Sequence, residues 1–126
     1  MNWSQIEFFY SREFECKCGC GLCHMDFEFV NRLDMARREC NVPFVVTSGY
    51  RCPSHNNTVS RSGFAGPHTT GKAADIQLYG THLRESLSIL SDLFERIGFA
   101  QKGSLETRFI HLDNLVGPEY GPIWTY

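Results

Sequence analysis

The sequence predicts an α+β fold, in which a small, mostly antiparallel sheet is flanked by helices. Two segments, 26–40 and 83–97, repeat apolar residues at helical spacing. Three short runs, 44–47, 73–79 and 108–113, have the aromatic, β-branched or alternating character of strands. Helices and strands alternate irregularly, and the signals of a hairpin come late in the chain. This order is typical of an α+β domain.

Composition limits the size and the class of the protein. With 126 residues, of which 42% are hydrophobic and 21% charged, we expect one domain spanning residues 1–126 and one core. The net charge is −2, and Lys and Arg are scattered, so nucleic acid is not an expected partner. We expect no membrane span and a monomer. The N-terminus lacks the pattern of a secretory signal, so the product is expected in the cytoplasm as synthesised.

The N-terminal third begins with an aromatic segment and a cysteine cluster. Residues 1–15 are rich in aromatics and are expected to pack onto the domain. Residues 16–24 then contain four cysteines between glycines: Cys16, Cys18, Cys20 and Cys23. Their spacing does not match the paired C-x2-C units of structural zinc modules. Three states remain open, namely free thiols, a metal held by some of the four, and disulfides that reach Cys40 or Cys52.

The first helix and strand have clear boundaries. Asp26 can cap a helix, and the apolar residues that follow recur at helical spacing until Asn41 and Pro43 end it. Residues 44–47 are predicted to form a buried strand that carries Ser48-Gly49-Tyr50-Arg51 at its end. Residues 52–67 are rich in Ser, Asn, Gly and Pro, which predicts a long surface loop with one helical turn.

The second half of the chain predicts a helix and a hairpin. Leucines and other apolar residues from Leu83 to Ile97 recur every three or four residues, which predicts a helix. Gly98 follows them, and glycine is common at the C-terminal end of helices. Residues 99–102 begin a strand, 103–107 turn it, and 108–113 return antiparallel. The aromatic residues of the C-terminal tail are expected to cover the sheet.

A candidate metal site lies in the segment GPHTTGKAADIQLY, residues 66–79. His68 and Asp75 are seven residues apart around Gly71, and they offer an imidazole nitrogen and a carboxylate oxygen. A catalytic zinc takes such ligands when it keeps one position open for water. Alternation along the strand directs Asp75 toward the site and Ile76 toward the core. The strand at 108–113 offers His111 as a third ligand.

Three ordered motifs resemble a known family of zinc peptidases. Residues 48–51 (SGYR), 68–75 (HTTGKAAD) and 109–113 (FIHLD) are similar to motifs of the zinc D-alanyl-D-alanine carboxypeptidase and L-alanyl-D-glutamate endopeptidase family. That family shares its fold with the Hedgehog signalling domain. Residues 124–126 (WTY) are also similar to the end of short, phage-associated members.

The resemblance implies a set of site residues and a reaction. It implies that His68, Asp75 and His111 bind one zinc ion and that Arg51 grips a substrate carboxylate. The implied function is zinc-dependent hydrolysis of peptidoglycan stem peptides, of the D,D-carboxypeptidase or the L-alanyl-D-glutamate endopeptidase type. Such an endolysin-like enzyme would act on the cell wall after release or export, or be carried by a phage.

The resemblance also implies an acidic general base near the third ligand. Asp113 follows His111 by two residues on the same strand face, so it is a candidate for the base or for a group that orients a ligand. Glu106, in the preceding turn, is the other candidate, provided that the hairpin curls inward. The chain departs from some relatives, because it has Arg108 where an E-x-x-H motif would have Glu and Gly66 where a serine is common.

Two other classes of function compete with hydrolysis. One is a catalytically inactive peptidase-like module that binds cell-wall peptide or a protein partner. The other is a metal or redox protein built on the cluster Cys16–Cys23, with a second metal held by its four cysteines. Zinc that is lost on His68→Ala favours the peptidase, whereas metal that is lost only with the cysteines favours the metal or redox protein.

Overall fold

Five short strands form one sheet in a computed structural model that describes all 126 residues. The strand order is β1-β2-β4-β3-β5, and every neighbouring pair is antiparallel except β3 and β5. The predicted α+β fold is therefore confirmed. The strands are β1 (Val45–Ser48), β2 (Ala73–Gln77), β3 (Arg96–Ala100), β4 (Phe109–Asp113) and β5 (Ile123–Thr125).

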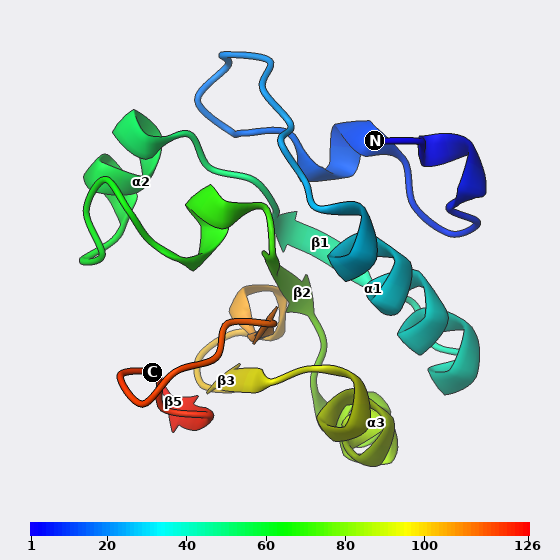
Figure 1. Cartoon of the computed structure of the whole chain (residues 1–126). Coiled ribbons are helices and arrows are strands. Elements are labelled where there is room, and N and C mark those ends of the chain that lie inside the picture. The colour runs from blue at the N-terminus through cyan, green and yellow to red at the C-terminus, as the bar shows by residue number, and fades with distance from the viewer.

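Three α-helices surround the sheet. α1 (Phe27–Cys40) and α3 (Gly80–Leu93) pack together on one side of the strands, and α2 (Pro53–Val59) lies on the opposite side (Figure 1). Short 3₁₀ turns connect these elements: η1 (Trp3–Gln5), η2 (Ser11–Phe14), η3 (Pro67–Thr70) and η4 (Leu105–Thr107). The predicted cap of α1 is confirmed, because the Asp26 carboxylate accepts the Phe29 N–H at 3.0 Å.

The first strand and the loop after it differ from their predictions. β1 is an edge strand that pairs only with β2, and one of its faces is solvated, so Val46 enters the core while Val45 is exposed. The prediction that 44–47 is a buried strand is wrong in this respect, since a strand with one solvated face alternates. The predicted loop 52–67 contains more helix than expected, because Pro53 occupies the first turn of α2, where its missing N–H costs nothing.

The end of the third helix was also predicted wrongly. α3 stops at Leu93, and both Ile97 and Gly98 belong to β3. Ile97 fits the helical spacing of the preceding apolar residues by coincidence. A buried residue of a strand is apolar too, so the sequence pattern alone does not distinguish the two. Gly98 does not cap a helix; it is needed because a Cβ there would overlap the indole of Trp124.

One row of residues crosses the sheet and prepares the site. Strand register aligns Asp75 with His111, His111 with Gly98, and Gly98 with Trp124. The next row, Ile76 opposite Ile110, has its side chains on the other face, as the alternation predicted, and both are fully buried. The polar row therefore faces away from the core that joins the sheet to α1 and α3.

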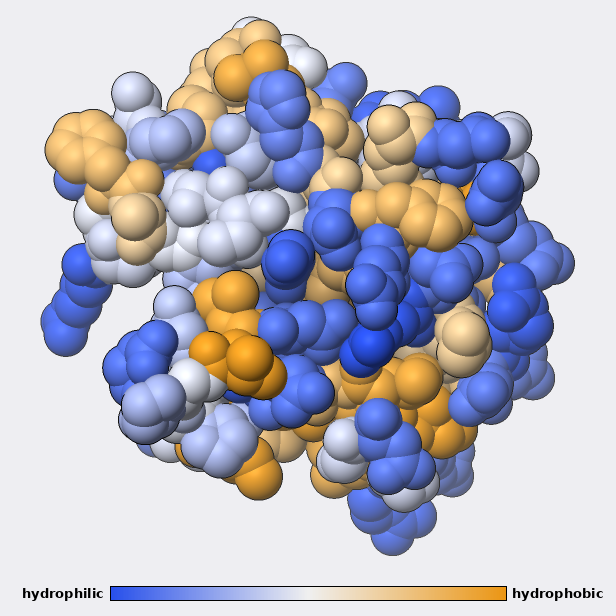
Figure 2. All heavy atoms as spheres, in the orientation of Figure 1, coloured by the Kyte–Doolittle hydropathy of each residue, from blue (hydrophilic) through white to orange (hydrophobic).

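Apolar side chains are concentrated in one interior cluster. Ile6, Phe9 and Phe14 belong to it, which confirms that the first fifteen residues pack onto the domain. On the surface shown in Figure 2, apolar residues form separate patches among hydrophilic ones. No helix has the length and apolar character needed to cross a bilayer.

Gly71 gives a stability prediction, because it turns the chain into β2. Its φ is +75°, and a Cβ would overlap the backbone carbonyl oxygen of His24. Gly71→Ala is expected to destabilise the fold by about 2–5 kcal/mol, the sum of left-handed strain and overpacking. Gly80→Ala is the control: its φ is +63° but its Cβ would meet nothing within 4 Å, so only about 1–2 kcal/mol should be lost. Urea unfolding measures both, and equal losses would contradict the steric argument.

Candidate active site

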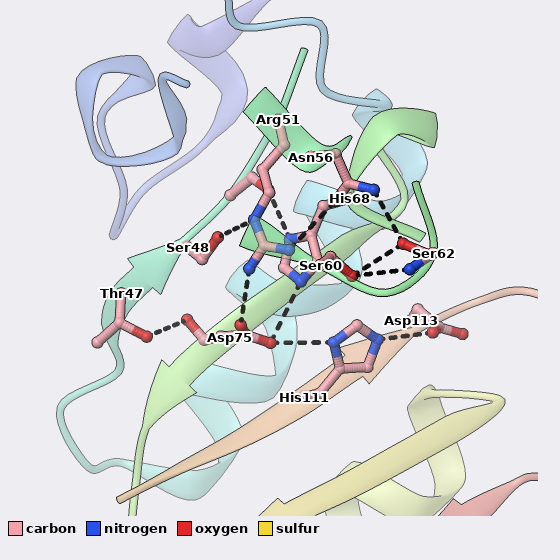
Figure 3. Close-up of polar contacts among 11 residues, drawn as sticks. Thr47, Ser48, Arg51, Asn56, Ser60, Ser62, His68, Asp75, His111 and Asp113 are labelled. Atoms are coloured by element: carbon pink, nitrogen blue, oxygen red, sulfur yellow. Dashed lines mark hydrogen bonds and ion pairs between the residues drawn. The ribbon is translucent and has the colours of Figure 1, made fainter. Parts of the chain in front are cut away.

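Three buried side chains from different elements converge on one point. Asp75 lies in the middle of β2 and His111 in the middle of β4, and strand register places them side by side. His68 arrives from η3, and Figure 3 shows its imidazole directed at Asp75. One ligand atom from each residue lies within 4.8 Å of the other two.

The loop that carries His68 is fixed to the segment after β1. The Arg51 backbone N–H donates to the His68 carbonyl at 3.1 Å. The His68 Nδ1 lies 2.7 Å from the carbonyl oxygen of Gly49, which can only accept, so Nδ1 carries the proton. Nε2 is left with its lone pair toward Asp75 Oδ1, 3.3 Å away.

The hydrogen bonds of His111 assign its tautomer in the same way. Its Nε2 donates to Asp113 Oδ2 at 2.7 Å, so Nδ1 directs a lone pair at Asp75 Oδ1, 2.9 Å away. Three electron-pair donors thus face one another, and a proton or a cation must lie between them. The separations are close to the ~3.3 Å expected between ligands of a tetrahedral zinc with bonds of about 2.0–2.1 Å. This donor set fits zinc.

The pKa values of Asp75 and His111 are shifted in opposite directions, and in both residues hydrogen bonding and charge outweigh the effect of burial. Burial alone would raise the pKa of Asp75, but hydrogen bonds with His111 and His68, together with their charge, lower it well below its usual range. Burial alone would lower the pKa of His111, but hydrogen bonds with Asp113 and Asp75 raise it above its ordinary 6.5. Asp75 is therefore ionised at neutral pH, and a proton competes with metal for His111.

Zinc binding at this site is expected to weaken as the pH falls through the raised pKa of His111. A protonated Nδ1 cannot bind metal, and the raised pKa of His111 means that the proton is held at pH values above 6.5. Affinity should fall by about tenfold per pH unit below the pKa of the folded protein and level off above it. Competition with a chelating dye from about pH 5.5 to 8.5, with His68→Ala as the blank, measures this. A flat profile would contradict the assigned ligand atoms.

Arg51 stands beside the three candidate ligands and is held in place. Its Nε donates to Ser48 Oγ at 3.1 Å, and Nη1 donates to Asn56 Oδ1 at 3.2 Å. Nη2 lies 3.7 Å from Asp75 Oδ2, the oxygen that does not face the histidines. The guanidinium keeps further N–H groups free, because it has five. It is therefore able to bind a carboxylate next to the metal position.

A cleft of about 310 Å³ opens over these residues. Polar groups line one part and the aromatic rings of Phe109, Trp124 and Tyr126 line another. Trp124 lies across Gly98 and packs against His111, with 5.3 Å between ring centroids. The full lining is Arg51, Asn56, Val59, Ser60, Ser62, Pro67, His68, Asp75, Phe109, His111, Trp124 and Tyr126.

Comparison with known families agrees with this geometry. A family model described as Peptidase M15 matches residues 7–113. The chain belongs to the Peptidase M15 family. No match was found among curated proteins or among solved structures.

Membership gives the site its chemical class. M15 peptidases are metallopeptidases that use zinc, and His68, Asp75 and His111 fit such a site. The resemblance seen in the three motifs is therefore confirmed. The match ends at Asp113, at the end of the strand that carries His111.

The two candidate bases of this M15 peptidase lie outside the cleft. Asp113 is fully buried behind His111, and its other oxygen accepts the Leu115 N–H at 3.0 Å. Glu106 is an exposed residue of η4, and its backbone carbonyl accepts a hydrogen bond from the Gln77 side-chain amide at 3.2 Å. No acidic side chain other than that of Asp75 lines the cleft. The geometry thus favours the orienting role for Asp113 and places Glu106 away from the metal position.

The cysteine cluster forms, but with a different fourth member. Cys16, Cys18, Cys20 and Cys52 bring their sulfur atoms within 4.8 Å of one another. Cys23, predicted as part of the set, lies apart, with its thiol 3.4 Å from the Ser11 carbonyl. Cys52 takes its place because the chain after Arg51 returns to the N-terminal segment. None of the six cysteines forms a disulfide.

Two residues contribute to the cleft through contacts that the sequence does not reveal. Asn56 is 1% exposed and holds Arg51 through its amide oxygen, while its amide nitrogen donates to Ser62 Oγ and to the Gly63 carbonyl. The polar composition of residues 52–67 does not reveal that Asn56 pairs with Arg51. Trp124 was expected to cover the sheet, but only strand register with Gly98 reveals its contact with His111.

Proposed function

We propose that this M15 peptidase hydrolyses stem peptides of peptidoglycan at a bond next to a free carboxylate. The observation that carries the proposal is the position of Arg51, whose guanidinium stands beside Asp75 with N–H groups to spare. A D-alanyl-D-alanine end and an L-alanyl-D-glutamate link both supply a carboxylate near the bond to be cut. A planar guanidinium binds such a group with two hydrogen bonds.

His68, Asp75 and His111 are proposed to hold the zinc through Nε2, Oδ1 and Nδ1. When bound, zinc polarises a carbonyl group and lowers the pKa of water to about 7. A hydrogen bond to the nitrogen that does not face the metal position fixes each imidazole. The Gly49 carbonyl accepts from Nδ1 of His68, and the Asp113 carboxylate accepts from Nε2 of His111. These contacts keep the lone pairs aimed inward.

Arg51 and the aromatic residues are proposed to position the peptide. The guanidinium orients the carboxylate, while Phe109, Trp124 and Tyr126 supply an apolar wall on the cleft. Ligand sites commonly combine such a wall with a few placed polar groups. Holding the scissile bond at the metal position is the main task of these groups, because orientation contributes strongly to rate.

Digestion of purified peptidoglycan tests the proposal. The zinc-loaded protein is incubated with cell-wall fragments, and mass spectrometry identifies the new ends. Release of D-alanine indicates a D,D-carboxypeptidase, and a new N-terminal D-glutamate indicates an L-alanyl-D-glutamate endopeptidase. His68→Ala and chelator-treated protein are the blanks. Binding of the fragments without new ends would support the inactive module instead.

Arg51→Lys is expected to lower kcat/KM by about 10- to 100-fold while zinc stays bound. Lysine keeps the positive charge near Asp75 but loses the planar, two-point hydrogen bond, and hydrogen bonds to charged groups contribute about 1.5–3 kcal/mol. The loss should occur with a synthetic peptide that bears a free carboxylate and disappear when that carboxylate is amidated. Arg61→Lys, an exposed arginine that does not line the cleft, is the matched control. An equal loss on both peptides would mean that Arg51 serves only to hold Asp75.

A further inference from the structure

Four cysteines outside the active site form a second cluster of metal ligands. Three of them lie within five residues of one another, and the fourth, Cys52, comes from the start of α2. We propose that Cys16, Cys18, Cys20 and Cys52 bind a structural zinc ion that joins the N-terminal segment to the end of β1. The proposal does not depend on the proposed function, because none of these cysteines lines the cleft.

The distances between sulfur atoms suit a tetrahedral site. The Sγ of Cys18 lies 3.5 Å from that of Cys16 and 3.7 Å from that of Cys52. A zinc ion with Zn–S bonds of about 2.3 Å separates its ligands by ~3.8 Å. All four sulfurs lie within 4.8 Å of one another, so they surround one point rather than forming two separate pairs.

The backbone around the cluster suits thiolate ligands. The Cys52 N–H donates to the Sγ of Cys16 at 3.3 Å, a contact that stabilises a negatively charged sulfur. Gly19 and Gly21 have φ values of +87° and +76°, and these left-handed residues fold the loop so that Cys18 and Cys20 turn toward Cys52. Cys16 is buried while Cys18 and Cys20 are exposed, which leaves the solvent side open for the metal to enter.

Soft thiolates and a tetrahedral arrangement select zinc or iron, and the arrangement of the chain indicates what the ion does. The aromatic N-terminal segment contacts the residues before Arg51: the Tyr50 N–H donates to the Phe14 carbonyl at 2.9 Å. A Cβ on Gly49 would lie 2.6 Å from Phe14 Cα, so the two segments touch through their backbones. A metal that binds Cys16 and Cys52 would fix both ends of this contact, and with it the segment that carries Arg51.

Metal analysis of protein purified without oxygen tests the site. Wild-type protein is expected to hold about two zinc ions per chain, and the Cys18→Ser/Cys20→Ser variant about one. Cys23→Ser is the matched control and should keep both, because Cys23 lies outside the cluster. His68→Ala should lose only the active-site zinc, so a failure of the proposed function and a failure of this site give different results.

Cobalt substitution of the wild-type protein gives a readout that requires no variant to fold. Cobalt bound by four thiolates gives strong sulfur-to-metal charge-transfer absorption, whereas the site of His68, Asp75 and His111 contains no sulfur and cannot. Alkylation followed by mass spectrometry should show the four cluster thiols protected until a chelator is added. Iron in place of zinc, disulfides among the four, or cobalt-loaded protein without this absorption would overturn the proposal.

Discussion

In an Asp75→Ala variant, the zinc of the histidine site and peptide hydrolysis are both expected to be lost. Oδ1 of Asp75 is the atom that faces both His68 and His111, at 3.3 and 2.9 Å. Its removal leaves two imidazoles and the cation of Arg51 around the metal position, with no anionic ligand. Zinc affinity should therefore fall by more than the ~10- to 100-fold that is typical when a residue that contacts a ligand, and not the metal itself, is changed. Hydrolysis should fall to the level of the chelator-treated protein.

Metal analysis and the peptidoglycan assay measure this loss together. One zinc ion should be missing from Asp75→Ala, while metal held by cysteine thiolates remains. Asp92→Ala, an exposed carboxylate on α3, is the control and should change neither quantity. Retained activity in folded Asp75→Ala protein would remove Asp75 from the site.

Asp113→Asn is expected to lower zinc affinity by about 10- to 100-fold, with activity restored at saturating zinc. Asp113 is fully buried and accepts the Nε2 proton of His111 at 2.7 Å, and it lies 3.4 Å from the Nε of Arg96. Its other oxygen accepts the Leu115 N–H at 3.0 Å, so the carboxylate is held in one position. An amide of the same size loses the charge that makes His111 a good ligand, and such changes typically cost this much affinity.

Rates at saturating zinc separate this orienting role from general-base catalysis. If Asp113 were the base, Asp113→Asn would keep its zinc and lose roughly 10²–10⁴ in turnover. Glu106→Gln is the companion variant and should be silent in both measurements, because Glu106 is exposed on η4 and does not line the cleft. A loss of turnover in Glu106→Gln would show that the hairpin moves to bring this carboxylate inward.

The three candidate ligands could be predicted because their signals are local. His68 and Asp75 flank one turn, and His111 lies in a strand whose polar and apolar residues alternate. The residues next to each ligand in the sequence were therefore enough to predict its element and the direction of its side chain. The pairing of Asp75 with His111 then follows from antiparallel register between β2 and β4. Assignment of their roles as zinc ligands rests on the motifs and on the convergence of their lone pairs.

What could not be predicted depends on contacts between distant segments. The partner of Gly98 is Trp124, and without it a glycine after a leucine-rich helix resembles a helix cap. Cys52 is distant from Cys16 in the sequence but lies beside it in the fold. The spacing within residues 16–24 therefore predicted Cys23 as the fourth member of the cluster. The edge position of β1 likewise depends on strand order, which the four residues of the strand do not encode.

We propose that His68, Asp75 and His111 together hold a catalytic zinc. A crystal structure of the zinc-loaded protein, with anomalous scattering recorded on both sides of the zinc absorption edge, tests it most directly. We expect an anomalous peak about 2.0–2.2 Å from Nε2 of His68, Oδ1 of Asp75 and Nδ1 of His111, with a fourth position open to the cleft. An empty position among these atoms in zinc-saturated crystals, or a metal bound through Nε2 of His111, would contradict it.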